Sequence, residues 1–286
     1  MEQIVYLNGS LIPRSGAKIS PFDFGFLYGY ALFESMRAYS ARVFRLDRHI
    51  ARLKRSSKVL GLGLPDVDFS KAVYDTIEAN GLSEARIRFT VSLGEGEANP
   101  DPTTCKNPTV FIAASGYIPL SDAVYHKGFS VVVSQVRRNS ALPLSRVKSA
   151  NYLDMILARA QAKESGADEA ILLNDRGCIA EGSTSNVFIV SAGKLITPSL
   201  DSGILSGVTR EAVLELASCF GIQAEERFVE QEDLYEADEA FLTNSVIEIM
   251  PLVEVDGKPV GLGSIGPITG RLIIEYKALA RKELDL

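Results

Sequence analysis

The chain has 286 residues, 46% of them hydrophobic and 23% charged, which is the balance of an ordinary soluble globular protein with room for two domains. Its formal net charge of −6 argues against nonspecific nucleic-acid binding, although a local pocket can still attract an anionic substrate. No apolar stretch approaches the length that spans a bilayer, and the N-terminus lacks a secretory signal pattern. We therefore expect a cytoplasmic protein with no nucleic-acid or membrane partner.

The residues that most often carry metal or nucleophilic chemistry are scarce. Cys105, Cys178 and Cys219 are widely spaced, and no pair has metal or redox spacing, which favours a reducing compartment. His49 and His126 are the two histidines, so a histidine-based zinc site is nearly excluded, and a Ser-His-Asp triad is too unless His126 serves it. Demanding chemistry in this chain therefore points to an organic cofactor and to no metal.

In the first half, short strands alternate irregularly with helices. The patterns predict a hairpin over 3–19, strands over 33–39, 86–93 and 109–113, and helices over 48–60 and 69–80. Arg52 lies off the apolar stripe of the first helix, which by itself is typical of a solvated charge. Arg86 and Arg88 share one face of a strand; such arginines usually face water, but an inward pair would suit a carboxylate ligand.

The second half follows a connection with no clear periodicity. Its patterns predict a strand over 129–133, hairpins over 170–181 and 186–197, a strand over 240–243, and helices over 152–164, 206–220 and from 268 onward. The first of these helices has its apolar positions at Leu153, Ile156, Leu157 and Ala160. We expect two α+β domains, a small N-terminal one of residues 1–118 and a larger β-rich one of residues 129–286, joined by residues 119–128.

Four features could carry chemistry, and each has an ordinary structural explanation. Lys148 enters a mostly apolar neighbourhood, where a neutral amine can form an imine with a carbonyl, but most lysines are solvated charges. Glu181-Gly182-Ser183-Thr184-Ser185-Asn186 is a plain turn or a buried acid aimed at a ring nitrogen. Ser206-Gly207-Val208-Thr209 is a threonine-capped helix start or an anion site. Thr243-Asn244-Ser245 is a strand end or a source of hydroxyl and amide groups.

Together these features form the set that binds pyridoxal 5′-phosphate: an imine-forming amine, a partner for the pyridine nitrogen and a phosphate cup. The chain resembles the class IV (fold type IV) pyridoxal-phosphate enzymes, the group of branched-chain aminotransferases, D-amino-acid aminotransferases and aminodeoxychorismate lyases. The resemblance rests on Val147-Lys148-Ser149-Ala150-Asn151-Tyr152-Leu153, on the segment from Ala180 to Phe188 and on residues 203–210. The 33-residue interval from Lys148 to Glu181 also fits the family.

The resemblance implies a role for each matching residue. Lys148 corresponds to the catalytic Schiff-base lysine, which also carries the α-proton, Glu181 to the acid on the pyridine nitrogen, and Tyr152 to the tyrosine near the phenolic oxygen. The other implied cofactor-binding residues are Arg52, Asn186, Leu205, Val208, Thr209 and Ser245. The implied substrate-binding residues are Tyr28, Phe33, Ser35, Arg37, Arg88, Asn244 and Val246.

The fold implied by the resemblance is α+β, with a small N-terminal domain and a larger pseudo-barrel domain flanked by helices. The implied assembly is a homodimer or a higher oligomer built from dimers. The implied reaction moves an amino group from a branched-chain or aliphatic amino acid to a 2-oxo acid such as 2-oxoglutarate.

Two alternatives stay open: pyruvate elimination by a 4-amino-4-deoxychorismate lyase, and transamination of D-amino acids or (R)-amines. The sequence departs from the branched-chain pattern at Tyr30, Ala31 and Ser35. Asn244-Ser245-Val246 also stands where that pattern has Gly-Thr-Ala, and the Ser35 hydroxyl and the Thr243-Asn244-Ser245 run are more similar to the lyases.

Overall fold

The structure, a computed structural model, describes residues 2–97 and 99–286, and the chain divides into two units. Unit 1 comprises Met1–Ile118, Val147–Asn151 and Glu283–Leu286, and unit 2 comprises Pro119–Arg146 and Tyr152–Lys282. The mixture of helices and sheets confirms the predicted α+β class. Unit 1 differs from the contiguous N-terminal domain of the prediction because the segment around Lys148 returns to it.

Unit 1 is built on a six-stranded sheet with the order β2-β1-β6-β5-β3-β4, and every neighbouring pair is antiparallel. Its strands are β1 (Ile4–Leu7), β2 (Ser10–Pro13), β3 (Ala31–Tyr39), β4 (Arg42–Val43), β5 (Ala85–Ser92) and β6 (Thr109–Gly116). Its helices are α1 (Phe24–Tyr28), α2 (Leu46–Leu60) and α3 (Phe69–Ala79), with short 3₁₀ turns at Arg14–Gly16 and Pro102–Thr104.

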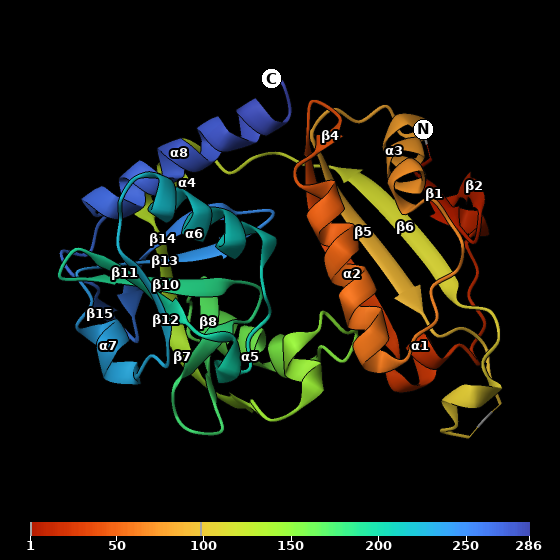
Figure 1. Cartoon of the computed structure of the whole chain (residues 1–286), viewed down its shortest axis with the longest axis horizontal. Helices are drawn as coiled ribbons and strands as arrows, with labels where there is room; N and C mark the ends of the chain where they lie inside the picture. The colour runs from red at the N-terminus through yellow and green to blue at the C-terminus, as the bar shows by residue number, and fades with distance from the viewer. Residues whose placement is uncertain (1, 98) are drawn as a thin grey trace. The chain divides into compact units, whose positions relative to one another are not determined.

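The apolar face of this sheet is covered by α2 and α3 (Figure 1). Leu32 and Met36 of β3 point into a core with Leu53 of α2 and Val73 of α3, all of them buried. Helix α2 begins two residues earlier than predicted, because Arg45 takes a left-handed conformation (φ 52°) at its N-cap position. This start places Leu46 in the first turn, where it joins the core.

Unit 2 is built on a nine-stranded sheet with the order β12-β11-β10-β13-β14-β7-β8-β9, and β15 pairs with β14. Its strands are β7 (Phe129–Arg138), β8 (Glu169–Asn174), β9 (Ile179–Gly182), β10 (Asn186–Ser191), β11 (Lys194–Pro198), β12 (Ala224–Arg227), β13 (Glu239–Asn244), β14 (Glu248–Val255) and β15 (Lys258–Pro259). Its helices are α4 (Asp122–Lys127), α5 (Leu153–Glu164), α6 (Val208–Cys219), α7 (Gln231–Tyr235) and α8 (Pro267–Glu283), with 3₁₀ turns at Pro143–Arg146 and Leu200–Ser202.

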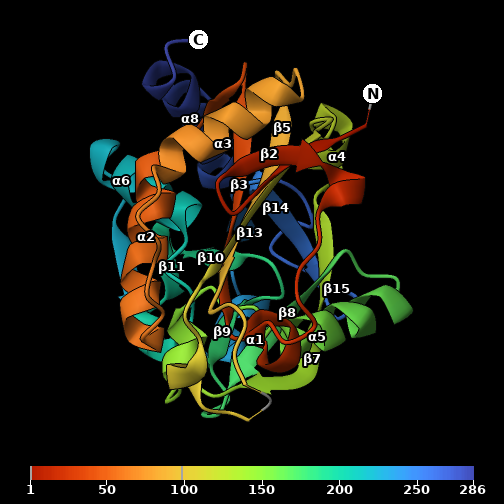
Figure 2. The same cartoon turned by 90° about the vertical axis from the view of Figure 1, so that its right-hand side faces the viewer.

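Helix α5 lies beside β7 and β8 (Figure 2), but it packs through a different face from the predicted one. Met155, Ala158 and Ala162 are its buried residues, and they pack on the apolar residues of β8. Leu153 and Ile156 are 67% and 58% exposed, so the apolar stripe read from the sequence lies on the outside of the chain. The small alanine side chains let α5 pack closely on the sheet. The sequence pattern counts apolar residues without regard to their size, so it did not predict this face.

Two smaller differences concern the connection and the strand after it. Residues predicted to be an irregular connection form α4, and Tyr125 is the buried residue of this helix. Strand β7 continues to Arg138, five residues beyond the predicted end. Within the described residues, no helix has both the length and the apolar character needed to cross a membrane.

Candidate active site

Lys148 belongs to a short segment that pairs with the edge of β3 in unit 1. The amide of Phe33 donates to the Lys148 carbonyl at 2.9 Å, and the amide of Ala150 donates to the Ala31 carbonyl at 2.7 Å. Between these two bonds, Ser149 forms an antiparallel bridge with Leu32. The backbone that carries the lysine is therefore fixed by the same strand that carries Phe33.

Phe33 brings two cations to one aromatic ring. The Arg88 guanidinium carbon lies 3.4 Å from the ring centroid, and Lys148 Nζ lies 4.6 Å from it. Arg88 Nε also donates to Thr90 Oγ1 at 3.1 Å, which fixes the plane of the guanidinium. Ser35 lies opposite Arg88 in the register of β3 and β5. Unit 1 thus gathers Phe33, Ser35, Arg88 and Lys148, four residues for which the family resemblance implies a substrate or catalytic role.

Arg52 is buried, contrary to the solvated charge that its place off the apolar stripe suggested. Its Nε donates to Glu34 Oε1 at 2.9 Å and its Nη2 donates to Glu34 Oε2 at 2.5 Å, a bidentate pair. His49 Nδ1 lies 2.7 Å from Glu34 Oε2. All three residues are at most 5% exposed, so this is a buried charged cluster between β3 and α2.

The cluster sets the protonation of its members. Burial opposes the charge of Glu34, but Arg52 and His49 outweigh it and lower the pKa of Glu34 to about 2. Burial is the main cause that lowers the pKa of His49, with a smaller contribution from the Arg52 and Lys148 charges against the raising effect of Glu34. His49 is therefore neutral near pH 7, and its Nδ1 carries the hydrogen that Glu34 accepts.

Two other predicted substrate residues have structural partners in unit 1. Tyr28 is 41% exposed at the end of α1, and its ring meets Phe24 edge-on with centroids 4.8 Å apart. Arg37 is buried, and its guanidinium carbon lies 4.2 Å from the Tyr39 ring centroid and 4.8 Å from that of Tyr117. Neither of these two ring contacts of Arg37 involves Phe33.

Glu181 is the centre of the predicted cofactor residues in unit 2. Its Oε2 accepts from the Leu205 amide at 3.0 Å and from Asn186 Nδ2 at 3.3 Å. Asn186 Nδ2 donates also to the Leu205 carbonyl at 2.8 Å. The carboxylate is 5% exposed, so it is the buried acid rather than the plain turn that the sequence allowed. Three predicted residues therefore form one hydrogen-bonded group.

Tyr152 and Asn244 contact neighbouring carbonyls of the loop that follows Glu181. The Tyr152 hydroxyl donates to the Ser183 carbonyl at 2.7 Å, and Asn244 Nδ2 donates to the Thr184 carbonyl at 3.0 Å. Asn244 Oδ1 accepts from the amides of Val246 and Ile247 at 2.8 and 2.9 Å. Asn244 thus closes the turn that holds Ser245 and Val246, which accounts structurally for a residue predicted to contact substrate.

The start of α6 combines two features of an anion site. Gly207 occupies the N-cap position without a side-chain cap, and a Cβ there would lie 2.1 Å from Asn186 Oδ1, so glycine is required. Thr209 in the first turn is 2% exposed, and its Oγ1 has no hydrogen-bond partner among the described residues. A buried hydroxyl without a partner is costly, whereas a phosphate at the helix N-terminus would accept from it.

Several polar residues of these clusters escaped the sequence analysis. Glu34 shares a strand face with Leu32 and Met36, so a carboxylate in an apolar row was the available signal. Glu169 accepts from the hydroxyls of Ser183 and Thr184, and nothing in its sequence neighbourhood pointed to it. Arg138 lay beyond the predicted end of the strand over 129–133. Among the described residues, no group of three or more histidine, cysteine or acidic side chains is suited to a metal ion.

Comparison with known proteins adds the family context. Residues 31–255 match the family model described as Amino-transferase class IV. The chain is 40% identical over 281 residues to the Methanocaldococcus jannaschii protein named "Putative branched-chain-amino-acid aminotransferase", covering 97% of this chain and 96% of the relative. It is 35% identical over 283 residues to the aminodeoxychorismate lyase of Bacillus subtilis, covering 96% and 94%.

A solved structure supports the same relationship. The T.th. branched-chain amino acid aminotransferase with pyridoxamine 5′-phosphate superposes with a TM-score of 0.92 at 30% sequence identity. The superposition covers 98% of this chain and 94% of that one.

Proposed function

Because the chain belongs to the class IV aminotransferase family, we propose that it moves an amino group between a branched-chain or other aliphatic amino acid and a 2-oxo acid such as 2-oxoglutarate. Family membership confirms the resemblance carried by the motifs, and with it the fold and pyridoxal 5′-phosphate (PLP) as the cofactor. When bound, PLP supplies a carbon that amines attack and a ring that takes up electrons.

The residues of unit 2 fit this cofactor. Thr209, a buried hydroxyl without a partner at an uncapped helix start, would hold the phosphate together with the Val208 amide. Glu181 would pair with the pyridine nitrogen, and Tyr152 would lie near the phenolic oxygen. Ser245 completes the proposed phosphate contacts, while Asn186 orients Glu181 and Leu205 packs against the ring.

In unit 1 we propose that Lys148 Nζ holds the cofactor and then carries a proton to and from the substrate α-carbon. Arg52 would contribute to the phosphate, because the bidentate pair with Glu34 holds its buried guanidinium in a fixed orientation. These assignments follow the family residue by residue. They are supported by the burial of Arg52 and by the ring contact between Lys148 and Phe33.

One observation carries the choice of substrate class. The Phe33 ring stands 4.6 Å from the reactive amine and 3.4 Å from the Arg88 guanidinium carbon. An apolar wall suits an aliphatic side chain, and a nearby guanidinium suits the second carboxylate of a 2-oxo dicarboxylic acid. Tyr28, Ser35, Arg37 and Val246 would complete the substrate-binding residues.

Pyruvate elimination from aminodeoxychorismate is the second candidate. It is favoured by the 35% identity to the Bacillus subtilis lyase and by the Ser35 hydroxyl opposite Arg88. Both reactions use the same cofactor, so the two functions are distinguished by which substrate the protein converts.

We expect L-leucine added to the PLP-loaded protein to convert the bound cofactor to its pyridoxamine form, and 2-oxoglutarate to restore the starting spectrum. The measurement is absorbance during successive additions, with D-leucine as the stereochemical control. No change with L-leucine, combined with pyruvate release from aminodeoxychorismate, would replace transamination by the lyase reaction. Conversion by D-leucine alone would select the D-amino-acid reading.

We further propose that the chain acts as a homodimer in the cytoplasm. Leu153, Ile156 and Leu157 leave an apolar stripe exposed along α5, each at least 50% exposed, and such a stripe normally meets a partner. The three cysteines are free in the described chain, which supports a reducing compartment.

The double substitution Leu153→Glu and Ile156→Glu is expected to weaken dimerisation by a factor of at least about 100, because two apolar side chains lose their burial. Sedimentation velocity across a concentration series measures this. Lys163→Glu, an exposed change on the same helix, is the matched control and should leave the dimer intact. A wild-type protein that stays monomeric, or a double variant that stays dimeric, contradicts this use of the α5 stripe.

A further inference from the structure

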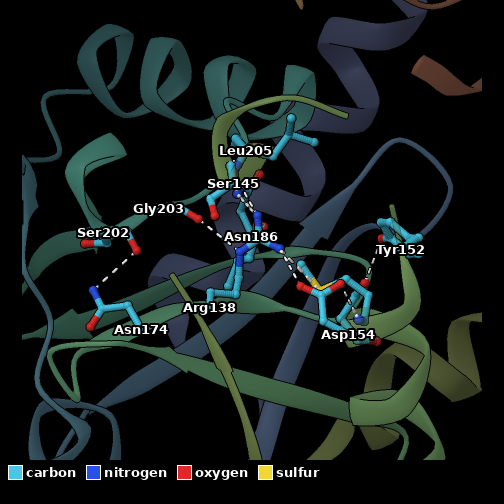
Figure 3. A network of polar contacts seen from close by, with 12 residues as sticks. Arg138, Ser145, Tyr152, Asp154, Asn174, Asn186, Ser202, Gly203 and Leu205 are labelled. Atoms are coloured by element: carbon cyan, nitrogen blue, oxygen red, sulfur yellow. Dashed lines mark hydrogen bonds and ion pairs between the residues drawn. The ribbon is translucent and has the colours of Figure 1, made fainter. Parts of the chain in front are cut away.

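Arg138 is a buried cation that no motif and no proposed role has used. It ends β7 and is 8% exposed. Its Nε donates to the Gly203 carbonyl at 3.0 Å, and its Nη2 donates to the Ser145 carbonyl at 2.7 Å. Figure 3 shows the guanidinium in the middle of these partners. One side chain therefore joins the loop before Leu205 to the turn that precedes the lysine segment.

The same guanidinium contacts the acid proposed for the cofactor ring. Arg138 Nη2 lies 3.3 Å from Glu181 Oε1, and both side chains are at most 8% exposed. Asp154 and Met155 at the start of α5 are more distant partners of Nη1, at 3.6 and 3.7 Å. Glu181 Oε2 is occupied by Leu205 and Asn186, so Arg138 supplies the positive charge on its other oxygen.

A buried carboxylate next to a basic ring nitrogen can share one proton in two ways. The proton can sit on the nitrogen, which leaves an ion pair, or on the carboxylate, which leaves a neutral pair. A guanidinium in direct contact with the carboxylate stabilises its anionic form, and this favours the proton on the nitrogen. A protonated ring nitrogen is the better electron acceptor, so the position of this proton affects the chemistry.

We propose that Arg138 is a positioning residue that holds Glu181 as an oriented anion and thereby keeps the cofactor ring nitrogen protonated. The inference rests on the proposed function, since it requires PLP with its nitrogen on Glu181. Arg138 also fixes the carbonyls of Gly203 and Ser145, and a lysine cannot reproduce this planar set of donors. This role of Arg138 is separate from the residue roles that the family motifs imply.

The test uses holoenzyme loaded with PLP labelled with ¹⁵N at the ring nitrogen. The variants are Arg138→Gln, which removes the charge, and Arg138→Lys, which keeps the charge but loses the planar set of N–H donors. Arg137→Gln and Arg137→Lys are the matched controls, because Arg137 is the adjacent residue and is exposed. The ¹⁵N chemical shift reports directly whether the ring nitrogen is protonated. Urea unfolding of the PLP-free single and double variants measures the coupling free energy between Arg138→Lys and Glu181→Gln.

We expect the nitrogen signal of Arg138→Gln to move toward that of an unprotonated ring, with Arg138→Lys in between and both Arg137 variants like the wild type. The catalytic rate constant should fall roughly tenfold in Arg138→Lys, the effect typical of residues that hold a ligand-binding side chain. In the absence of PLP, Arg138→Lys and Glu181→Gln should be non-additive.

Three results are decisive against the proposal. A nitrogen signal that is unchanged in the Arg138 variants, or that moves equally in the Arg137 variants, overturns it and leaves the transaminase function standing. Additive unfolding energies in the PLP-free proteins would show that Arg138 and Glu181 are not coupled. A wild-type protein that binds no labelled PLP refutes the proposed function instead, so the two failures are distinguishable.

Discussion

Replacing Lys148 by alanine is expected to lower the transamination rate by a factor of at least about 10⁴, because the amine proposed to hold the cofactor and to carry the proton is lost. The variant should also release PLP on dialysis and lack the absorbance of the covalently held cofactor. Initial rates with L-leucine and 2-oxoglutarate, together with cofactor content after dialysis, measure both effects.

Lys127→Ala provides the matched control, since Lys127 is an exposed lysine at the end of α4. It should keep the wild-type rate and cofactor content. A Lys148→Ala protein that retains more than about one per cent of the rate would assign the proton transfer to another residue.

Replacing Glu34 by glutamine is expected to lower the free energy of unfolding by about 3–5 kcal/mol, because the change leaves the buried Arg52 guanidinium without its anion. The amide retains the size of the side chain, so the effect reports charge and hydrogen bonding rather than packing. Urea unfolding at pH 7 measures it. A loss below about 1 kcal/mol would mean that water or another group replaces the carboxylate.

Glu84→Gln is the control for this measurement. Glu84 pairs with Arg37 at 3.6 Å and is 37% exposed, and a pair of that kind contributes about 1 kcal/mol or less. The pH dependence adds a second check. Glu34 has a pKa of about 2 in the folded protein against 4.5 as its ordinary value, so its contribution is present above pH 4.5 and is lost as the pH falls toward 2.

His49 acts in a higher pH range and in the same direction. Its pKa is lowered from 6.5 by burial, so the unfolded chain takes up the proton first and stability falls below pH 6.5. The acid slope between pH 4.5 and 2 should therefore shrink in Glu34→Gln, whereas the loss beginning near pH 6.5 reports His49.

The sequence predicted the parts of the site that lie in contiguous motifs. Glu181 and Asn186 belong to a short segment singled out from its residues, Leu205 follows from the family resemblance, and the structure joins the three by hydrogen bonds. Arg52 was proposed only through the family, because its local pattern is that of a surface charge. Its partner Glu34 lies 18 residues away on a strand, and no local periodicity contains such a pairing.

The apolar face of α5 shows a different limit of sequence reasoning. Periodicity identified Leu153, Ile156 and Leu157 as one stripe, and they do share a side of the helix. The pattern could not distinguish burial within the chain from exposure, and the sheet is covered by Ala158 and Ala162 instead. Small residues that permit close packing are inconspicuous in a hydrophobicity pattern, which favoured the larger side chains.

The pairing of residues 148–150 with the edge of β3 has a consequence for biosynthesis. A ribosome delivers the six strands of the first sheet by residue 116, but the segment that closes the edge at Ala31 and Phe33 follows only after β7 has emerged. Until residues 148–150 are synthesised, the Phe33 amide and the Ala31 carbonyl lack these hydrogen-bond partners. Lys148 therefore joins this edge after the six strands have been synthesised, so completion of the first unit depends on synthesis of the chain beyond it.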